Sequence, residues 1–303
     1  MSTLVRVTVP GGISAIFEPC IHNDPIASGA RGAGIGFKDA VEVELKIFPS
    51  EKLIIENSIN GQLVRGGIGE IAVKTFFGML GIEPEYKVII NQKISIPMGS
   101  GFGTSAASAL GIVLALSKEL NVPLSVVQAG DIAHLAEIRA KSGLGTVSGL
   151  VNIGDIVIVV HPGAPSVCLV DRIPLPSPDV RLVVASKGRI ETAEALRDRD
   201  LVNKAMKLGK VAVDELLQKP TIENFFKLAR WFAENVGLMT KTIEYIIVEL
   251  SKFAIGAAQS MIGDAIFALV WREDVDDVLK IIDDLWHVSG IVGEPVSSGF
   301  YLE

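Results

Sequence analysis

The sequence predicts an α+β protein built of two domains. The chain has 303 residues, which is too long for one average domain and comfortable for two. Strand patterns come in runs and are followed by runs of helix patterns, which favours α+β over a regular alternation of the two. A segment with five prolines, residues 161–178, separates the two parts. We place the boundary after residue 170, which gives domains over residues 1–170 and 171–303.

The elements expected in the first domain follow from the spacing of apolar residues. Alternation of apolar and polar residues predicts strands over 4–9, 41–47 and 86–96. A glycine-rich stretch, residues 28–36, leads into the second of them. Apolar periodicity predicts helices over 68–80, 104–120 and 123–141. A loop over 142–149 then leads into an apolar strand over 151–160.

The second domain begins with an apolar strand over 180–185. Residues 192–251 are mostly helical in pattern, and a strand over 265–271 and a helix over 274–286 follow before short terminal strands. Strands and helices of this kind complete the α+β prediction.

Composition excludes several classes of protein. Hydrophobic residues make up 49% and charged residues 21%, so the chain has a sizeable core and is not disordered. The net charge of −7 argues against a nucleic-acid-binding face. No apolar run reaches the roughly 20 residues of a membrane span, and the N-terminus lacks a signal-peptide pattern. We therefore expect a cytoplasmic protein with no membrane or nucleic-acid partner.

Cysteine and histidine are too sparse for a transition-metal site. The two cysteines, Cys20 and Cys168, make at most one bridge, and the sequence leaves that pairing open. The four histidines are scattered and show no paired helical spacing.

Three glycines at alternate positions, Gly99, Gly101 and Gly103, mark a loop at residues 97–107 between a predicted strand and a long apolar helix. Glycine leaves no side chain on that edge of the loop, so backbone N–H groups can approach a phosphate closely. The helix that begins near Thr104 adds unpaired N–H groups and the positive end of its dipole. The loop therefore predicts a polyphosphate-binding site.

Other glycine motifs fit this loop less well. It lacks the lysine of a Walker loop, and its third glycine falls one position too early for the dinucleotide-binding fingerprint. The alternative is a glycine-rich turn in which Thr104 merely caps the helix. A cap does not require three alternating glycines, which favours the phosphate site.

Residues 97–107 resemble the central motif of the GHMP kinases, Pro-x-Gly-x-Gly-x-Gly-Ser-Ser-Ala-Ala, with Thr104 in place of the first serine. Residues 9–18 are similar to the first motif of this superfamily, although Gly12 stands where members commonly have a histidine. Residues 256–264 are similar to a degenerate third motif, a loop that packs near the phosphates. The resemblance implies an ATP-dependent small-molecule kinase of the two-domain GHMP kinase fold, with an S5-like N-terminal domain and a ferredoxin-like C-terminal domain.

The resemblance also implies which residues bind ATP and magnesium. In these kinases a serine of the loop and a glutamate of a nearby helix hold the magnesium ion. Ser105 and Glu137 occupy those positions and are the predicted catalytic and metal-binding residues. From the residues alone, Glu137 could equally form a surface pair with Lys141, four residues on. The predicted ATP-binding residues belong to the loop: Pro97, Gly99, Ser100, Gly101, Gly103, Thr104, Ser105 and Ala106.

The chain departs from the superfamily pattern after this glutamate. Several members carry an aspartate in the following loop, and here Val151 falls at about that place. Asp155 would reach the position only with a gap. In this respect the chain is more similar to homoserine kinase, and we assign no catalytic base.

Within the superfamily, residues 17–25 and 28–35 and the Gly-Arg-Ile-Glu-Thr run at 188–192 resemble the archaeal pantoate kinases of the coenzyme A pathway. The implied reaction converts D-pantoate to 4-phosphopantoate. Arg31 is the predicted clamp for the substrate carboxylate, because its planar fork suits bidentate binding. The other predicted substrate-binding residues are Ser14, His22, Asp24 and Ser28.

Simpler interpretations of these residues stay open. Arg31 could be a solvated loop residue, His22 a structural histidine, and Asp24 a turn residue before Pro25. The alternative enzymes are GHMP kinases of the homoserine or mevalonate type. The alternative of another class is a catalytically inactive GHMP-fold protein that binds or regulates. The intact glycines with Ser105 and Glu137 favour an enzyme, while the missing aspartate favours the inactive protein. We expect a homodimer, because most soluble oligomers are two-fold homodimers.

Overall fold

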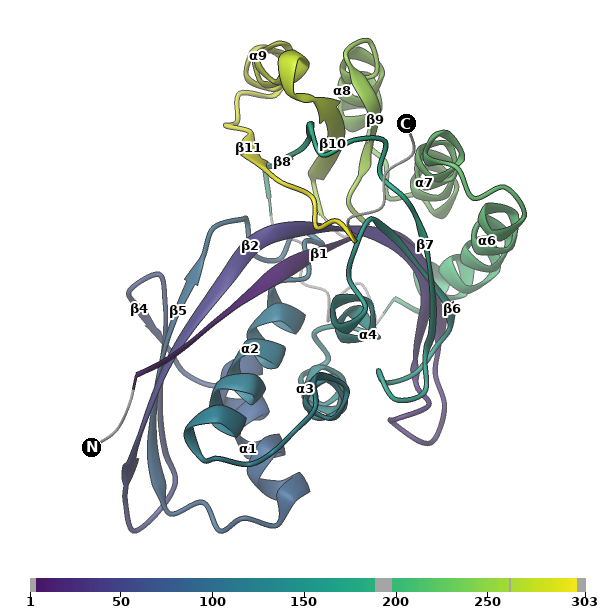
Figure 1. Ribbon diagram of the computed structural model, residues 1–303. Helices are drawn as coiled ribbons and strands as arrows, with labels where there is room; N and C mark the ends of the chain where they lie inside the picture. The colour runs from purple at the N-terminus through teal and green to yellow at the C-terminus, as the bar shows by residue number, and fades with distance from the viewer. Residues whose placement is uncertain (1–3, 189–197, 262, 299–303) are drawn as a thin grey trace.

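The computed structural model describes residues 4–188, 198–261 and 263–298. Two separate β-sheets with helices packed against them confirm the α+β prediction. The larger sheet carries the N-terminal half of the chain and the smaller sheet the C-terminal half (Figure 1).

The larger sheet is organised around a long antiparallel ribbon of two strands. Its strands follow the order β4-β3-β5-β2-β6-β7, and β1 pairs with β2 along the ribbon. They are β1 (Val5–Cys20), β2 (Gly29–Pro49), β3 (Ile54–Ile59), β4 (Gln62–Val64), β5 (Tyr86–Ile94), β6 (Ile156–His161) and β7 (Leu169–Ile173). The ribbon arches over the helices that fill its concave side (Figure 1).

Four helices lie under this arch: α1 (Gly67–Leu80), α2 (Thr104–Glu119), α3 (Val126–Ala140) and α4 (Thr146–Val151). Helix α2 is buried along most of its length and packs against α1, α3 and the ribbon. A helix that is apolar on nearly all sides is typical of a protein interior. Its small residues, such as Ala107 and Gly111, allow the ribbon to pack close to it, and a Cβ on Gly111 would lie 2.7 Å from Val43.

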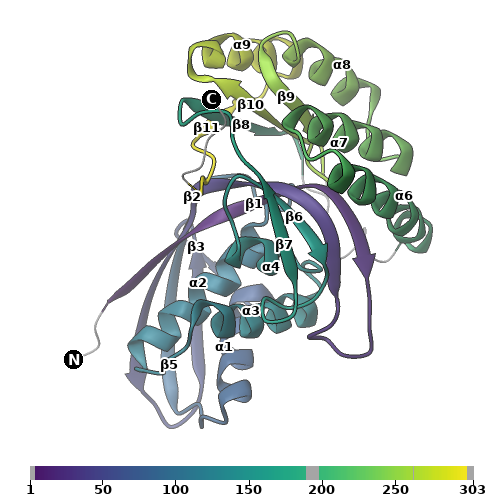
Figure 2. The same ribbon diagram turned by 45° about the vertical axis from the view of Figure 1, so that its right-hand side comes forward.

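The smaller sheet is antiparallel, in the order β11-β8-β10-β9. Its strands are β8 (Val180–Ser186), β9 (Ala254–Gln259), β10 (Ala265–Trp271) and β11 (Ile291–Gly293). Helices α8 (Lys241–Leu250) and α9 (Val275–Trp286) cover one face of it, with a 3₁₀ turn at Arg272–Asp274 before α9. Helix α6 (Arg199–Gln218) lies against the outer side of the ribbon (Figure 2), and α7 (Ile222–Val236) packs both on β1 and on β9 of the smaller sheet.

One hydrophobic cluster runs through both halves of the molecule. It includes Leu45 and Ile90 in the larger sheet, Ala212 and Phe232 on α6 and α7, and Phe267 in the smaller sheet. A second cluster lies between α8, α9 and the other face of the smaller sheet. The two halves are therefore packed as one body rather than joined by a free linker.

Most predicted elements agree with the structure, but the strands β7 and β9 were not predicted, and other features differ as well. The predicted boundary after residue 170 falls inside β7, which pairs with β6, so the larger sheet continues to Ile173. Helix α4 was not predicted, because six residues are too few to show a helical period. The glycine-rich stretch was expected to lead into a strand, but its residues 29–36 are part of β2.

Close approach of the two ribbon strands explains the glycines in β2. A Cβ on Gly32 would lie 2.3 Å from the Ile16 carbonyl oxygen, and one on Gly34 would lie 2.3 Å from that of Ile13. The register of the ribbon shifts between Ser14 and Ile16 at this point. Glycine is needed here so that the two strands can pack closely. Sequence reasoning takes glycine as a turn signal and does not detect this use.

The C-terminal segment returns from the smaller sheet to the larger one. Pro295 forms a β-bridge with Phe37, and Val296 N–H donates to Gly36 O at 2.9 Å. Asp155, which is 1% exposed, accepts hydrogen bonds from the Ser297 hydroxyl and from the backbone and hydroxyl of Ser298. Asp155 therefore holds Ser297 and Ser298 against the start of β6.

We predict that Asp155→Asn weakens this attachment. Asparagine tolerates the left-handed backbone of this position, φ 60°, so the change removes the charge without adding strain. Hydrogen bonds to a charged group contribute about 1.5–3 kcal/mol, and we expect a loss of about 2 kcal/mol of unfolding free energy in urea. Asp171→Asn, at an exposed position on β7, is the matched control. Equal stability of the two variants would contradict this account of the chain end.

Candidate active site

The glycine loop adopts a backbone that other residues rarely reach. Gly99, Gly101 and Gly103 have φ values of 72°, 75° and 66°, all in the left-handed region. Alternation of left- and right-handed residues turns successive N–H groups toward one concave side, which is an anion-binding arrangement. The glycines therefore serve the backbone shape itself, in addition to leaving space for a ligand.

Helix α2 begins at this loop without a side-chain cap. Gly103 is its N-cap residue, and no side chain accepts a hydrogen bond from the first turn. The interpretation of Thr104 as a plain cap is therefore wrong: Thr104 is the first helical residue and is 5% exposed. The N–H groups of the first turn have no partner in the helix and are available to a ligand.

The first motif packs directly against this loop. A Cβ on Gly103 would lie 2.6 Å from Gly12 O, and a Cβ on Gly11 would lie 2.9 Å from Phe102 O. Ser14 N–H donates to Gly101 O at 3.3 Å. A histidine in place of Gly12, as in many GHMP kinases, would have to displace Leu150 and Thr146, because a Cβ at this position would lie 3.2 Å from each of them.

The third motif approaches the same loop from the smaller sheet. Met261 N–H donates to Ser14 O at 3.0 Å, and the Gly263 Cβ position lies 3.3 Å from the Ser100 Cα. Ser100 is 1% exposed, and its hydroxyl is 2.8 Å from that of Ser186 at the end of β8. The loop is thus held from both halves of the molecule, and the Ser100 side chain is used for this contact.

Glu137 is buried near the start of α4. It is 1% exposed, so the alternative of a surface pair with Lys141 is wrong. Burial raises the pKa of its carboxyl to about 7, although hydrogen bonds from the N–H groups of Val147, Gly145 and Thr146 oppose the shift. A Cβ on Gly143 would lie 2.1 Å from Glu137 Oε1, so this glycine makes room for the carboxylate.

Two buried oxygen atoms from residues five positions apart in the chain lack partners. Glu137 Oε2 and Ser142 Oγ are both buried without a hydrogen bond. Buried polar atoms are normally satisfied, and of the six in the described residues that are not, these two belong to residues that line the same cavity and could meet a ligand there. Both residues line a single cavity together with Ser105.

This cavity joins most of the predicted ATP-binding and metal-binding residues. It is lined by Gly99, Gly101, Gly103, Thr104, Ser105, Ala106 and Glu137. Of the predicted substrate-binding residues, Ser14 and Arg31 line it too. Its remaining wall is largely apolar, and includes Ile16, Phe17, Ile35, Ile153, Val157 and Val159.

The other predicted site residues lie outside the cavity. Pro97 and Ser100 belong to the loop but do not line it. His22, Asp24 and Ser28 lie in the turn that joins β1 to β2, where Asp24 Oδ1 accepts from Ile26 N–H at 2.9 Å. Ser28 Oγ donates to His22 O and accepts from His22 N–H, both at 2.9 Å. These contacts organise the turn, and a substrate role for the three residues stays a prediction.

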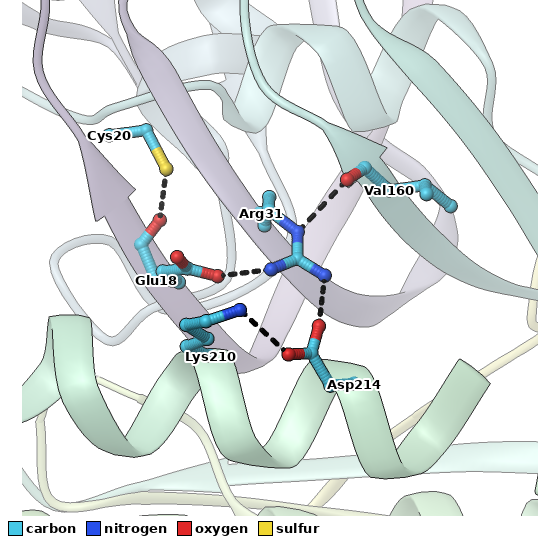
Figure 3. A network of polar contacts seen from close by, with 6 residues as sticks. All are labelled: Glu18, Cys20, Arg31, Val160, Lys210 and Asp214. Carbon is cyan, nitrogen blue, oxygen red and sulfur yellow. Dashed lines mark hydrogen bonds and ion pairs between the residues drawn. The ribbon is translucent and has the colours of Figure 1, made fainter. Parts of the chain in front are cut away.

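The guanidinium of Arg31 is occupied by the protein itself (Figure 3). Its Nη1 donates to Glu18 at 2.8 Å, its Nη2 to Asp214 at 2.6 Å and its Nε to Val160 O at 2.9 Å. The side chain is 16% exposed. Arg31 is therefore not a solvated loop residue, and the binding of a substrate carboxylate by its fork stays a prediction.

Sequence reasoning missed many residues of the cavity, among them three with polar or flexible side chains. Ser142 and Thr146 are hydroxyl residues in the segment after Glu137, and Met261 belongs to the third motif. Ser142 and Thr146 could have been found from the sequence, because they lie close to Glu137 along the chain. The Gly-Arg-Ile-Glu-Thr run lies outside the described residues after Gly188.

Asp155 and the cysteines do not add to the site. Asp155 does not line the cavity, and its carboxylate binds the C-terminal serines as described above. Cys20 and Cys168 are both free thiols: Cys20 Sγ donates to Glu18 O, and Cys168 Sγ to Pro165 O. In the described part of the chain, none of the helices combines the length and apolar character needed to cross a bilayer.

Comparison with known proteins places this geometry in a family. Residues 64–160 match the family model of the GHMP kinase N-terminal domain. The chain is 32% identical to a pantoate kinase of Thermococcus kodakarensis, over 93% of each chain. It is 32% identical to a pantoate kinase of Methanocaldococcus jannaschii, over 90% of this chain and 95% of that one.

A solved structure agrees with these sequence relatives. A protein described as a phosphotransferase related to the CoA biosynthesis pathway superposes with a TM-score of 0.86 at 30% identity, over 98% of this chain and 97% of that one. The fold, the motif order and the relatives confirm the GHMP kinase resemblance. The chain therefore belongs to the GHMP kinase superfamily and, within it, to the family that contains these pantoate kinases.

Proposed function

We propose that this protein is a pantoate kinase, which transfers the γ-phosphoryl group of ATP to the primary hydroxyl of D-pantoate and forms 4-phosphopantoate for coenzyme A biosynthesis. One observation carries the proposal: the uncapped phosphate loop, Ser105 and the buried Glu137 open into the same cavity as an apolar wall. The family relatives named above support pantoate as the acceptor.

The oxygen donors of the site suit a magnesium ion. Glu137 Oε2 and Ser142 Oγ are buried without partners, and the Ser105 hydroxyl lines the same cavity. Magnesium prefers hard oxygen ligands and usually takes only one or two carboxylates, with phosphate and water oxygens completing its shell. We infer that Glu137 and Ser105 hold it, and that the ion, when bound, neutralises the phosphate charge.

The chain's own groups supply positioning and charge. The N–H groups of the loop and of the first turn of α2 hold the phosphates, since phosphoryl transfer depends on alignment and on electrostatic stabilisation. The buried position of Glu137 keeps its carboxylate at one place and excludes water from it. We assign no side chain as the base that accepts the hydroxyl proton.

The apolar wall favours pantoate over other acceptors of the superfamily. Pantoate carries a gem-dimethyl group beside the hydroxyl that is phosphorylated. Ile16, Phe17, Val157 and Val159 line the wall, and burying one methylene contributes about 0.8 kcal/mol. Homoserine has no such group, so this wall would bind it more weakly.

Two wider expectations accompany the proposal. ATP as the phosphate donor is consistent with a cytoplasmic enzyme, and the acidic chain of net charge −7 argues against nucleic acid as a partner. We expect a homodimer from the prevalence of two-fold assemblies alone.

Gly101→Val tests the nucleotide site. Valine cannot adopt φ 75° without strain, so the loop should lose the shape that holds the phosphates, and ATP binding should fall below detection in calorimetry. Gly61→Val is the matched control, because Gly61 has φ 78° and lies in the β3–β4 turn away from the cavity. ATP binding by Gly101→Val as tight as by Gly61→Val would refute the assignment.

Glu137→Gln tests the metal site. Glutamine keeps the size of the side chain and removes its charge, so turnover should fall by at least about 100-fold and the magnesium requirement should rise. Steady-state rates over a magnesium titration measure both effects. Glu70→Gln, on the surface pair with Lys74, serves as the control and should keep parental rates. Normal turnover of Glu137→Gln would contradict the assignment.

The same variant should alter the pH dependence of stability. The carboxyl of Glu137 has a folded pKa of about 7 against a usual 4.5, so the folded state holds a proton that the unfolded state releases between these values. The parent therefore loses stability as pH rises through this range, by about 3 kcal/mol for a shift of that size.

Glu137→Gln lacks this loss. In the presence of EDTA, its unfolding free energy relative to the parent should rise by about 2–3 kcal/mol between about pH 5 and about pH 8. The pKa of Glu70 is lowered by its hydrogen bond from Lys74, so Glu70→Gln should show no such rise. A pH-independent difference for Glu137→Gln would mean that the carboxyl titrates normally.

A panel of acceptors tests the substrate and the alternatives together. ADP release and phosphorus NMR should show a phosphorylated product with D-pantoate, and a kcat/KM at least about tenfold higher than with homoserine or mevalonate. A preference for homoserine or mevalonate would keep the kinase and change the substrate. ATP binding with no turnover on any acceptor would favour an inactive binding protein.

A further inference from the structure

Arg31 belongs to a cluster that joins β1, β2, β6 and α6. Its guanidinium lies between Glu18 on β1 and Asp214 on α6, and Lys210 Nζ binds Asp214 Oδ2 at 2.9 Å (Figure 3). All three sides of the guanidinium have a protein acceptor, including Val160 O on β6. The Arg31 side chain therefore connects β1, β2 and β6 of the larger sheet with helix α6.

The charges of this cluster balance without a ligand. Arg31 and Lys210 are cations, and Glu18 and Asp214 are carboxylates. The hydrogen bond from Arg31, followed by that from Lys210, lowers the pKa of the Asp214 carboxyl, which keeps it ionised at neutral pH. A substrate carboxylate placed on Arg31 would meet the 14% exposed Glu18 at close range and give the cluster a net negative charge. Like charges at short separation are costly when partly buried.

A second contact brings α6 onto β1 at the same place. A Cβ on Gly209 would lie 2.3 Å from Phe17 O and 2.9 Å from the Glu18 Cα, both backbone atoms of β1. Gly209 therefore permits the axis of α6 to lie closer to the strand than any other residue would allow. The Phe17 ring packs edge-on against Phe232 on α7 with centroids 6.1 Å apart.

This strand segment is also a wall of the cavity. Ile16, Phe17 and Arg31 line it on one side, and none of them belongs to the phosphate loop. The position of α6 thus determines where this wall stands relative to the loop. We propose, on the basis of the proposed function, that Arg31 is a positioning residue: it holds α6 against β1 and fixes the acceptor wall, and it does not itself bind the substrate carboxylate.

Three variants separate this proposal from the carboxylate clamp. Arg31→Ala removes the centre of the cluster, Asp214→Asn removes its α6 partner, and Gly209→Ala moves α6 away from β1 without changing any charge. Arg6→Ala is the matched control, since Arg6 forms an exposed cross-strand pair with Glu44 on the same two strands. The readouts are kcat, both KM values and the thermal midpoint, with D-pantoate and with pantoyl alcohol, which lacks the carboxylate.

The positioning role predicts one pattern for all three variants. Each should lower kcat/KM at least about fivefold, by the same factor with both acceptors, and leave the KM for ATP unchanged. The double variant Arg31→Ala/Asp214→Asn should have a kcat/KM within about twofold of the poorer single variant, because both changes break the same contact. Arg6→Ala should keep parental values.

Two results would overturn the proposal. In the first, Arg31→Ala loses turnover with pantoate but not with pantoyl alcohol, while Asp214→Asn keeps or improves turnover with pantoate; Arg31 would then be the clamp. In the second, the thermal midpoints fall while kcat and KM stay parental well below them; the cluster would then be structural alone. The proposed function is tested separately, by whether the parent enzyme phosphorylates pantoate at all. The positioning role is tested by the ratio of each variant's kcat/KM to that of the parent, measured with whichever acceptor the parent uses.

Discussion

The left-handed backbone at Gly99, Gly101 and Gly103 is the constraint on which the rest of the site depends. The three glycines have no side chains to anchor them, and the first N–H groups of α2 have no intrahelical partners, so the loop has to be held by its surroundings. The first motif holds it through the Ser14–Gly101 hydrogen bond, and the smaller sheet holds it through Ser186 and Gly263. The first and third motifs, which are distant from the loop in sequence, support it from two different elements.

The same site balances stability against function. Burial raises the pKa of Glu137, so the folded protein is destabilised whenever this group is ionised. A glutamine at position 137 would avoid that cost, but it would remove the carboxylate that we propose as a metal ligand. A buried carboxyl with a raised pKa, and an unpaired Ser142 hydroxyl that lines the same cavity, support the proposed cation site.

Features that depend on residues close together in the sequence could be predicted, and contacts between residues distant in the sequence could not. The glycine loop and the helix α2 follow from local spacing, and the structure agrees with both. The assignment of the loop's ATP-binding residues came from the resemblance and stays a prediction. Glu137 followed from a resemblance, because its burial and its place beside Gly143 are products of packing. The partners of Arg31 were not predictable: Asp214 lies 183 residues further along the chain, and no pattern in sequence pairs them. The glycines of β2 were placed before the strand and not within it, because strand-to-strand contact at Gly32 and Gly34 leaves the same sequence signal as a turn.

The central claim is that the three motifs form one nucleotide site around the glycine loop. Hydrogen–deuterium exchange, measured with and without ATP and magnesium, tests it most directly, because it reports the backbone N–H groups to which the claim refers. Bound nucleotide should slow exchange in residues 99–106, and also in residues 12–14 and at Met261 and Gly263, which pack on the loop or on the first motif. Residues 241–250 of α8, which lie away from the cavity, should be unaffected. Saturating ATP that leaves the exchange of 99–106 unchanged would contradict the account.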